Sequence, residues 1–198
     1  MSWTKNPSQR LFEAKLEPPP SGAVFLRGEE RHDQPQIRDL VEASFPGTGE
    51  ALLVDRLRSD GDLVLSLVAE DGGVVTGYVA FSRLMLEGES EPFPAVALAP
   101  LAVYPEYQQQ GIATQLVREA HACLAALGET LSVVLGEPGY YGRFGYSNKR
   151  AARFESEFQS PFLMALSFGS APSEGRLVYP AAFNLLTEDA AHQADHRV

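Results

Sequence analysis

Cysteine is nearly absent from this sequence of 198 residues: Cys123 is the only one, so no disulfide can form within the chain. Such cysteine usage is typical of a reducing compartment and predicts a cytoplasmic protein. Apolar runs of the ~20 residues that a membrane helix needs are also missing. The first 20 residues are polar and lack the apolar segment of a signal peptide. The sequence therefore predicts no association with a membrane.

Basic residues are few as well: 16 Lys and Arg stand against 26 Asp and Glu, which gives a formal net charge of -10. A surface with this charge repels phosphate backbones, so DNA and RNA are not expected as partners. The charge favours a cationic partner such as an amine. The histidines show no spacing that would hold a metal ion, and the glycine-rich motifs of P-loop and dinucleotide-binding proteins are absent.

The chain is long enough for one domain with a single hydrophobic core. Apolar residues make up 44% of the sequence and can supply that core. Residues 1–22 include a run of three prolines and predict a flexible N-terminal arm. Residues 186–198 predict a polar C-terminal tail. The folded domain is therefore expected to occupy residues 23–185.

Hydrophobic periodicity within this domain predicts both strands and helices. The strand pattern is found at 23–27, 63–70, 74–86, 93–103, 131–135, 154–158, 162–168 and 175–179, the last two expected to pair. The helical pattern is found at 33–45, where Asp33 is the expected cap, at 52–61 and at 111–128. Hairpins precede a single strand–helix–strand crossover, so the fold class expected is α+β, or mixed α/β, and not doubly wound.

Residues 98–114 carry the strongest chemical signal, because a strand ends there, a short loop follows and a helix begins at Gly111. The first turn of a helix presents unpaired N–H groups and a partial positive charge of about half a unit, which together bind phosphate without a lysine. Gly111 has no Cβ, so a pyrophosphate can approach the backbone closely. Ala113 keeps that approach open, and Thr114 can add a hydroxyl.

Pro100 lies inside the strand predicted at 93–103. Proline cannot donate a hydrogen bond to a sheet, so it belongs at an edge or at a bulge. A bulge at this point would leave the following backbone groups unpaired with the next strand. Those groups could then bind an extended ligand that carries amides, as the pantetheine arm of coenzyme A does.

The spacing Gln108-x-x-Gly111-x-Ala113 resembles the [Gln/Arg]-x-x-Gly-x-[Gly/Ala] signature of the GNAT superfamily of N-acetyltransferases. The run 136–146 resembles a later motif of the same superfamily, in which a Tyr precedes a Gly–aromatic pair by four residues. The run 178–183 is similar to the YhbS-like bacterial branch. The resemblance covers roughly residues 23–185, and its distinctive motifs lie within 98–146.

This resemblance implies a GNAT-like acyl-CoA N-acyltransferase fold, with a mixed, mostly antiparallel sheet flanked by helices and open between strands 93–103 and 131–136. Acetyl-CoA, the acyl-donor cosubstrate, would lie in that opening. Tyr141 takes the position of the general acid that protonates the thiolate of CoA, and a phenol with an ordinary pKa of about 10 keeps its proton at neutral pH. The cofactor-binding residues implied by position are Leu101, Ala102, Val103, Gln108, Gln109, Gln110, Gly111, Ile112, Ala113, Thr114 and Phe144.

The general base departs from the family pattern. Many relatives carry a Glu on the strand before the phosphate loop, whereas residues 96–99 of this chain are all apolar. An Asn that often precedes the catalytic Tyr is missing too. Glu137, at the end of the neighbouring strand, is therefore the candidate for the base.

Several of these residues also have a purely structural interpretation. Tyr140, Tyr141, Phe144 and Tyr146 could form an aromatic cluster that closes the core. Cys123 lies on the apolar face of the helix at 111–128 and is expected to be a packed thiol, whereas His121 on the same helix is expected to be exposed.

The predicted function is transfer of an acetyl group to a primary amine that attacks acetyl-CoA directly in a ternary complex, because no residue resembles a covalent acetyl carrier. The alternative is a non-catalytic acyl-CoA-binding or sensor module that kept the cofactor slot and lost the base. The acceptor stays open between a small-molecule amine, a peptide N-terminus and a protein lysine. The segments 33–60 and 86–92 are expected to shape its pocket, and the family is compatible with a homodimer.

Overall fold

The structure, a computed structural model, describes residues 24–88 and 91–186. Its strands are β1 (Phe25–Gly28), β2 (Leu63–Asp71), β3 (Val74–Glu87), β4 (Phe93–Val103), β5 (Leu131–Leu135), β6 (Phe154–Glu155), β7 (Leu163–Ser167) and β8 (Gly175–Val178). Its helices are η1 (Arg31–Asp33), α2 (Gln34–Ser44), α3 (Gly49–Asp60), η2 (Pro105–Tyr107), α4 (Ile112–Ala126), α5 (Pro138–Tyr141), η3 (Gly142–Phe144), α6 (Asn148–Ala151) and η4 (Ala181–Phe183).

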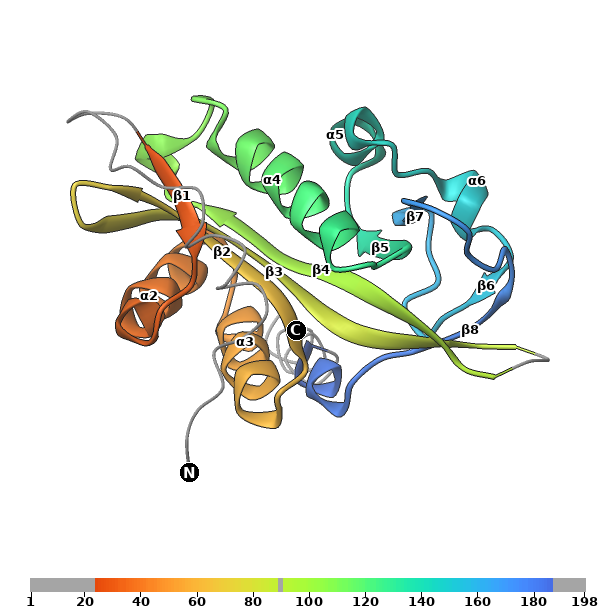
Figure 1. Cartoon of the computed structure of the whole chain (residues 1–198). Helices are drawn as coiled ribbons and strands as arrows, with labels where there is room; N and C mark the ends of the chain where they lie inside the picture. Colours follow the sequence, from red (N-terminus) through yellow and green to blue (C-terminus); the bar gives the residue numbers. More distant parts are fainter. Residues whose placement is uncertain (1–23, 89–90, 187–198) are drawn as a thin grey trace, which may run out of the picture.

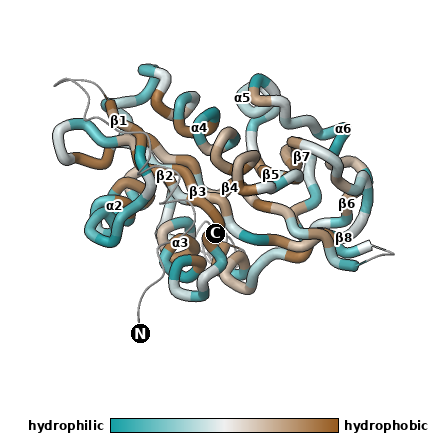
Figure 2. Tube along the Cα trace, in the orientation of Figure 1, coloured by the Kyte–Doolittle hydropathy of each residue, from teal (hydrophilic) through white to brown (hydrophobic). Residues whose placement is uncertain are grey.

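One sheet of eight strands forms the middle layer of the molecule, with β1-β2-β3-β4-β5-β7 as neighbours and β8 paired to β3 and β6. Helix α4 covers one face, and α2 and α3 cover the other (Figure 1). Leu116 of α4 packs on Leu67 and Phe81 on the first face, and Leu40 of α2 packs on Tyr78 on the second. Figure 2 shows the matching pattern, with hydrophobic stretches along the central strands and a largely hydrophilic α2.

The α+β class and the open, mostly antiparallel sheet expected from the sequence are confirmed. Parallel pairing among the described strands is confined to β4 with β5 and β6 with β8. The hairpin expected from 63–70 and 74–86 is present as β2 and β3. No helix within the described ranges is long and apolar enough to cross a membrane.

Two strand predictions were wrong in part. The strand expected at 154–158 ends at Glu155, because the Ser156 hydroxyl accepts the Phe158 N–H at 3.1 Å and turns the chain out of the ladder. The segments 162–168 and 175–179 do contain strands, β7 and β8, but these do not pair with each other. Strand β7 pairs with β5, where its apolar residues are buried, and β8 pairs with β3 and β6.

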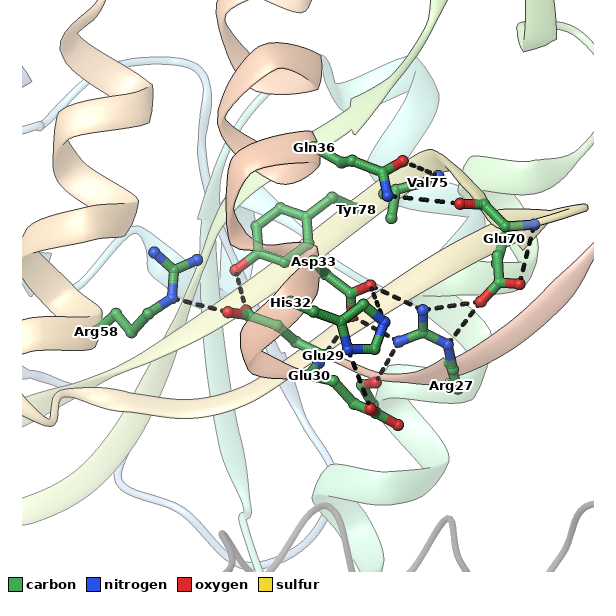
Figure 3. Close-up of polar contacts among 12 residues, drawn as sticks. Arg27, Glu29, Glu30, His32, Asp33, Gln36, Arg58, Glu70, Val75 and Tyr78 are labelled. Atoms are coloured by element: carbon green, nitrogen blue, oxygen red, sulfur yellow. Dashed lines mark hydrogen bonds and ion pairs between the residues drawn. The ribbon is translucent and has the colours of Figure 1, made fainter.

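Asp33 does not cap α2 through its side chain, which corrects the sequence prediction. Its carboxylate instead accepts the Glu30 N–H at 2.8 Å and a forked pair of hydrogen bonds from Arg27 at 2.6 and 2.8 Å (Figure 3). Arg27 also reaches Glu70 on β2 at 2.8 Å. A guanidinium fork gives two charge-assisted hydrogen bonds between full charges, so the carboxylate goes to Arg27 of β1 and fixes the start of α2 against the sheet.

Helix α3 is held to the sheet by a second group of polar residues, which Figure 3 also shows. Arg58 of α3 donates to Glu29 at 2.7 Å, and the Tyr78 hydroxyl donates to the same carboxylate at 3.0 Å. Burial, reinforced by the charge of Glu29, raises the pKa of Tyr78 well above its ordinary value, so the phenol remains a donor. These contacts set the position of α3, whose other end reaches the candidate site.

Candidate active site

The sheet opens between β4 and β5, as the resemblance implied. The two strands pair at only three positions, Val96–Leu98 of β4 with Ser132–Val134 of β5. The register of β4 against β3 shifts by one residue between Leu98 and Leu101, so an extra residue is accommodated around Pro100. The bulge predicted at this proline is therefore confirmed, and the described pairing with β5 ends just before it.

Backbone groups of β4 beyond the bulge are directed into this opening. Tyr104 donates its N–H to the Thr76 carbonyl of the neighbouring chain segment at 3.1 Å. Hydrogen-bonded and non-hydrogen-bonded positions alternate along an antiparallel ladder, so Ala102 bonds to β3 and Leu101 and Val103 do not. The N–H and C=O groups of Leu101 and Val103 therefore face away from β3, toward the space between β4 and β5.

A cavity of about 490 Å³, which we name the loop cavity, lies where these groups meet the start of α4. Leu101 and Val103 form one side, and Tyr140 and Arg143 close another. The full lining is Leu101, Val103, Tyr107, Gln108, Gln109, Gly111, Ile112, Ala113, Thr114, Tyr140 and Arg143. Eight of the implied cofactor-binding residues are thus brought together, and Ala102, Gln110 and Phe144 line neither this cavity nor the second one described below.

The loop before α4 is shaped to present its backbone. Helix α4 begins at Ile112, one residue later than predicted, with Gly111 as its N-cap at φ 84°. Gln109 is also left-handed, at φ 60°. A Cβ added at Gly111 would have the Gln115 side chain as its nearest neighbour at 3.8 Å, so this face of the glycine is open. The first three N–H groups of α4 have no helical acceptor and are available to an anion.

Gln108 and Gln110 leave the loop in different directions. The Gln108 side-chain amide donates to the Val103 carbonyl at 3.1 Å, which joins the loop to the end of β4. The Gln110 amide donates to the Glu106 carbonyl at 3.1 Å and stays exposed. Ala102 has its side chain buried in the cluster under α2, on the opposite face of the sheet.

Tyr140 and Arg143 line the loop cavity, although the sequence interpretation placed Tyr140 only in the aromatic cluster and did not name Arg143 as a site residue. The Arg143 guanidinium lies 4.0 Å from the centroid of the Tyr140 ring, and its Nε donates to the Tyr140 carbonyl at 3.0 Å. The Tyr140 hydroxyl is buried near Thr114 but makes no hydrogen bond of normal geometry with the described residues. Arg143 is the only charged residue between 138 and 146, and that isolated cation was the available signal.

A second cavity, of about 560 Å³, occupies the opening between β4 and β5, and we name it the splay cavity. Its walls are mostly apolar, and Glu50 is its only charged residue among those the structure describes. The lining is Phe45, Pro46, Glu50, Leu53, Ala97, Leu98, Ala99, Pro100, Leu101, Val133, Val134, Leu135, Tyr141, Phe158, Tyr179, Phe183 and Leu186. Leu101 lines both cavities, so the two meet at the end of the bulge. Of the two segments predicted to shape the acceptor pocket, 33–60 lines this cavity and the described part of 86–92 does not.

Two phenols line the splay cavity, those of Tyr141 and Tyr179, and Tyr141 lies in α5, which directly follows β5. Its ring lies against the backbone of Gly136, where an added Cβ would be only 2.2 Å from the Tyr141 Cε2 atom. Burial, and to a lesser extent Tyr140, raises the pKa of Tyr141 above its ordinary value. The hydroxyl therefore stays protonated across the neutral range and can act as a proton donor.

The aromatic cluster considered as the structural alternative is present as well. The Tyr141 ring packs edge-on against Tyr140 and Tyr146, with centroids 5.0 and 6.0 Å apart. Phe144 belongs to this cluster and packs against the imidazole of His121. Tyr141 thus belongs both to the cluster and to the wall of the splay cavity, whereas Phe144 belongs to the cluster alone.

His121 is not exposed, which corrects the sequence prediction. Its imidazole packs edge-on against Phe81 and Phe168, and its Nε2 lies 3.2 Å from the Tyr146 hydroxyl. That hydroxyl also lies 2.7 Å from the Ser132 hydroxyl. Burial lowers the pKa of His121 to about 4, so the ring is neutral at physiological pH. Cys123 is buried on the same helix, as predicted.

Glu137 stands apart from this arrangement. It is the N-cap of α5, its side chain is exposed, and it lines neither the loop cavity nor the splay cavity. Its place as the base stays a prediction from the sequence: its backbone carbonyl accepts the Tyr141 N–H at 3.0 Å, whereas its exposed side chain lines neither cavity.

The chain belongs to the GNAT acetyltransferase family: the sequence model described as "Acetyltransferase (GNAT) domain" matches residues 26–148. Escherichia coli K12 YhbS, named an uncharacterized N-acetyltransferase, is 45% identical over 124 residues, which cover 62% of this chain and 73% of YhbS. The crystal structure of E. coli YhbS in complex with CoA matches with a TM-score of 0.77 at 35% identity, over 85% of this chain and 96% of that one. A Brucella melitensis GNAT family acetyltransferase in complex with acetyl-CoA matches with a TM-score of 0.69 at 34% identity, over 81% and 98%.

Proposed function

We propose that this protein transfers an acetyl group from acetyl-CoA to a primary amine. The observation that carries the proposal is the meeting of the two cavities at Leu101, one under the N-terminus of α4 and the other beside Tyr141. A ligand with its phosphates at α4 would extend along Leu101 and Val103 and present its acyl end to the splay cavity. The relatives solved with CoA and acetyl-CoA support the same donor.

The residues of the loop cavity fit acetyl-CoA. The open face of Gly111 and the first N–H groups of α4 suit a pyrophosphate. The backbone of Leu101 and Val103 offers hydrogen bonds to the amides of pantetheine. Arg143 adds a cation beside this anion site, and the buried hydroxyl of Tyr140 can donate to an oxygen of the ligand.

In the proposed reaction, bound acetyl-CoA supplies a thioester, and the amine nitrogen attacks its carbonyl carbon. A C–N bond forms and the C–S bond breaks. The backbone N–H of Val103 polarises the carbonyl oxygen. Tyr141 gives its phenolic proton to the departing sulfur and recovers one, relayed by water, from the nitrogen, which loses a proton as the amide forms. Cys123 is buried on α4 and lines neither cavity, so direct transfer is favoured over a covalent relay.

Two measurements test this function. Acetyl-CoA should raise the thermal midpoint, because a ligand that binds only the folded state stabilises it. Free thiol should then appear when a panel of primary amines is added to the complex. Binding without thiol release from any amine would favour the sensor alternative, which the apolar residues 96–99 of β4 leave open. No shift of the midpoint would contradict both functions. A cytoplasmic location and a homodimer stay predictions from the sequence.

A further inference from the structure

The splay cavity is where an acceptor amine would have to give up a proton. An alkylamine is almost entirely an ammonium ion at neutral pH, because the ordinary pKa of such a group is about 10. The ammonium ion has no electron pair with which to attack a thioester. An enzyme that uses it must therefore take a proton from it first, with a carboxylate or an imidazole beside the substrate.

The bases that could be expected from the sequence do not line this cavity. Residues 96–99 of β4 are all apolar. The exposed carboxylate of Glu137 and the neutral imidazole of His121 line neither the splay cavity nor the loop cavity. A base for an ammonium ion would therefore have to come from another residue of the cavity wall.

The wall itself offers no free base among the residues that the structure describes. Its titratable residues are Glu50, Tyr141 and Tyr179. Glu50 already takes part in an interaction within the protein and is not free. Burial raises the pKa of the Tyr141 and Tyr179 phenols above the ordinary value, so both keep their protons at neutral pH. These surroundings suit an amine that arrives without an extra proton.

The far wall of the splay cavity is aromatic. Phe158, Tyr179 and Phe183 contact one another with ring centroids 5.0 to 6.0 Å apart, and all three line the cavity. Ala97 and Ala99 of β4 lie on the same side of the sheet, where their short side chains leave space. An aromatic ligand gains burial and ring contacts in such surroundings, whereas an ammonium ion loses its hydration there.

We propose that the acceptor is an arylamine, which enters the splay cavity as the neutral amine and needs no base from the protein. An amino group attached directly to an aromatic ring shares its electron pair with the ring, so it is a weak base and is already neutral at neutral pH. The neutral group costs less to bury than an ammonium ion, and its ring suits the aromatic wall. This inference rests on the proposed function, and it makes neither Glu50 nor Glu137 the base.

The proton balance of the reaction closes without a base. The electron pair of the neutral nitrogen attacks the carbonyl carbon, a C–N bond forms, and the C–S bond breaks with its electron pair on sulfur. Tyr141 gives its proton to that sulfur. An N–H bond then breaks, and its proton returns to Tyr141 through water. One proton has moved from nitrogen to sulfur, and the protein ends in the state in which it began.

The first test is a pH profile of the unmodified protein. Thiol release from acetyl-CoA is measured with p-anisidine and with phenethylamine between about pH 7 and about pH 9, and the rate without protein is subtracted. Tyr141 keeps its proton over this range, because burial raises its pKa. If only the neutral amine reacts, kcat/KM should rise by about tenfold per pH unit for phenethylamine and stay level for p-anisidine.

A level profile for phenethylamine would show that the protein takes a proton from a bound ammonium ion, and it would overturn the inference. At neutral pH, p-anisidine should have a kcat/KM at least about tenfold above that of phenethylamine, of which only about one part in a thousand is then neutral. Preference for phenethylamine or for a lysine-containing peptide would overturn the inference and leave the proposed function intact. Thiol release with none of these amines, despite acetyl-CoA binding, would overturn both.

The second test measures binding and does not depend on turnover. Calorimetry on the CoA-bound protein gives the affinity for p-anisidine. Phe158→Leu replaces one ring of the aromatic wall by an apolar chain, and it should weaken binding by about two- to tenfold, the range of one ring contact. Phe162→Leu makes the same change at an exposed phenylalanine that lines neither cavity, and it should keep the affinity.

Unchanged acetyl-CoA affinity in both leucine variants shows that the fold is intact. Equal affinities of the two variants for p-anisidine would then overturn the inference, because the aromatic wall would not contact the acceptor. The pH profile needs no variant, so it decides the matter even if Phe158→Leu does not fold.

Discussion

The loop cavity and the splay cavity differ in how the chain builds them. The loop cavity comes mainly from the segment 101–114, with Tyr140 and Arg143 added from one later turn. The splay cavity collects residues from 45–53, 97–101, 133–135, Tyr141 and 158–186. The first offers mostly backbone groups, and the second mostly side chains. A common donor can therefore be bound by a short local segment, while the acceptor depends on long-range packing.

Tyr141→Phe should give the largest difference between the effect on turnover, which depends on the splay cavity, and the effect on acetyl-CoA affinity, which depends on the loop cavity. The variant removes the proton donor and almost no volume, so turnover should fall by the ~10²–10⁴ typical of lost acid catalysis while acetyl-CoA affinity changes little. Thiol release under conditions where chemistry limits the rate, together with calorimetry, measures both. Tyr104→Phe, outside both cavities, is the control. Near-normal turnover in Tyr141→Phe would show that the acid role is wrong.

Gly111→Val should act on the loop cavity alone. The new side chain would enter the open face of the loop, so acetyl-CoA affinity should fall by about tenfold or more, from the loss of even one charge-assisted hydrogen bond. The positive φ also costs on the order of 1–3 kcal/mol of stability. Gly128→Val has the same φ of 84° in open space at the other end of α4, so it shares the strain and should keep the affinity. Equal affinities in the two variants would contradict the phosphate-loop assignment.

Gly136→Ala should alter the splay cavity indirectly, by displacing the Tyr141 ring. The added methyl would overlap the Tyr141 ring, which must then move, and misplacing a catalytic group by about 1 Å can cost a hundredfold in rate. We expect turnover to fall by about ten- to hundredfold, while acetyl-CoA affinity is retained. Gly139→Ala, where a Cβ would meet nothing within 4 Å, is the matched control. If both alanines behave alike, Gly136 does not position Tyr141.

Tyr140→Phe should have the opposite effect to Tyr141→Phe: it should lower acetyl-CoA affinity and not turnover. Tyr140 lines the loop cavity and Tyr141 the splay cavity, although they are adjacent in α5. Loss of the Tyr140 hydroxyl should weaken acetyl-CoA binding by roughly two- to tenfold, the range of one neutral hydrogen bond, and leave turnover at saturation unchanged. Calorimetry and saturation kinetics separate the two effects. A fall in turnover without a change in affinity would place Tyr140 at the reacting atoms instead.

His121→Gln should have the smallest effect, on stability and not on binding. The pKa of His121 is lowered by burial from 6.5 to about 4 in the folded protein. Between these values the unfolded chain takes up a proton that the folded chain does not, so stability is lost as the pH falls from 6.5 toward 4. The variant should lose stability less steeply over this interval, as measured by urea unfolding at several pH values. Parallel curves for the two proteins would contradict this assignment.

The parts of the site that could be predicted from the sequence depend on local backbone geometry. The strand, bulge and loop of 98–114 follow from proline, glycine and periodicity within a few residues of one another. The burial of His121 could not be predicted, because Phe81, Phe168 and Tyr146 reach it from distant segments. The lining of the splay cavity could not be predicted for the same reason, since this cavity forms only when five segments meet.

The N–H and C=O groups of Leu101 and Val103, which face away from β3 into the opening of the sheet, have a consequence for comparing relatives. Side-chain substitutions at these two positions leave the N–H and C=O groups in place, so donor recognition can persist while the sequence around it diverges. The walls of the splay cavity have no such protection, because each substitution there alters the shape that an acceptor meets. Membership of the family therefore predicts the identity of the acyl donor far more reliably than it predicts the identity of the acceptor.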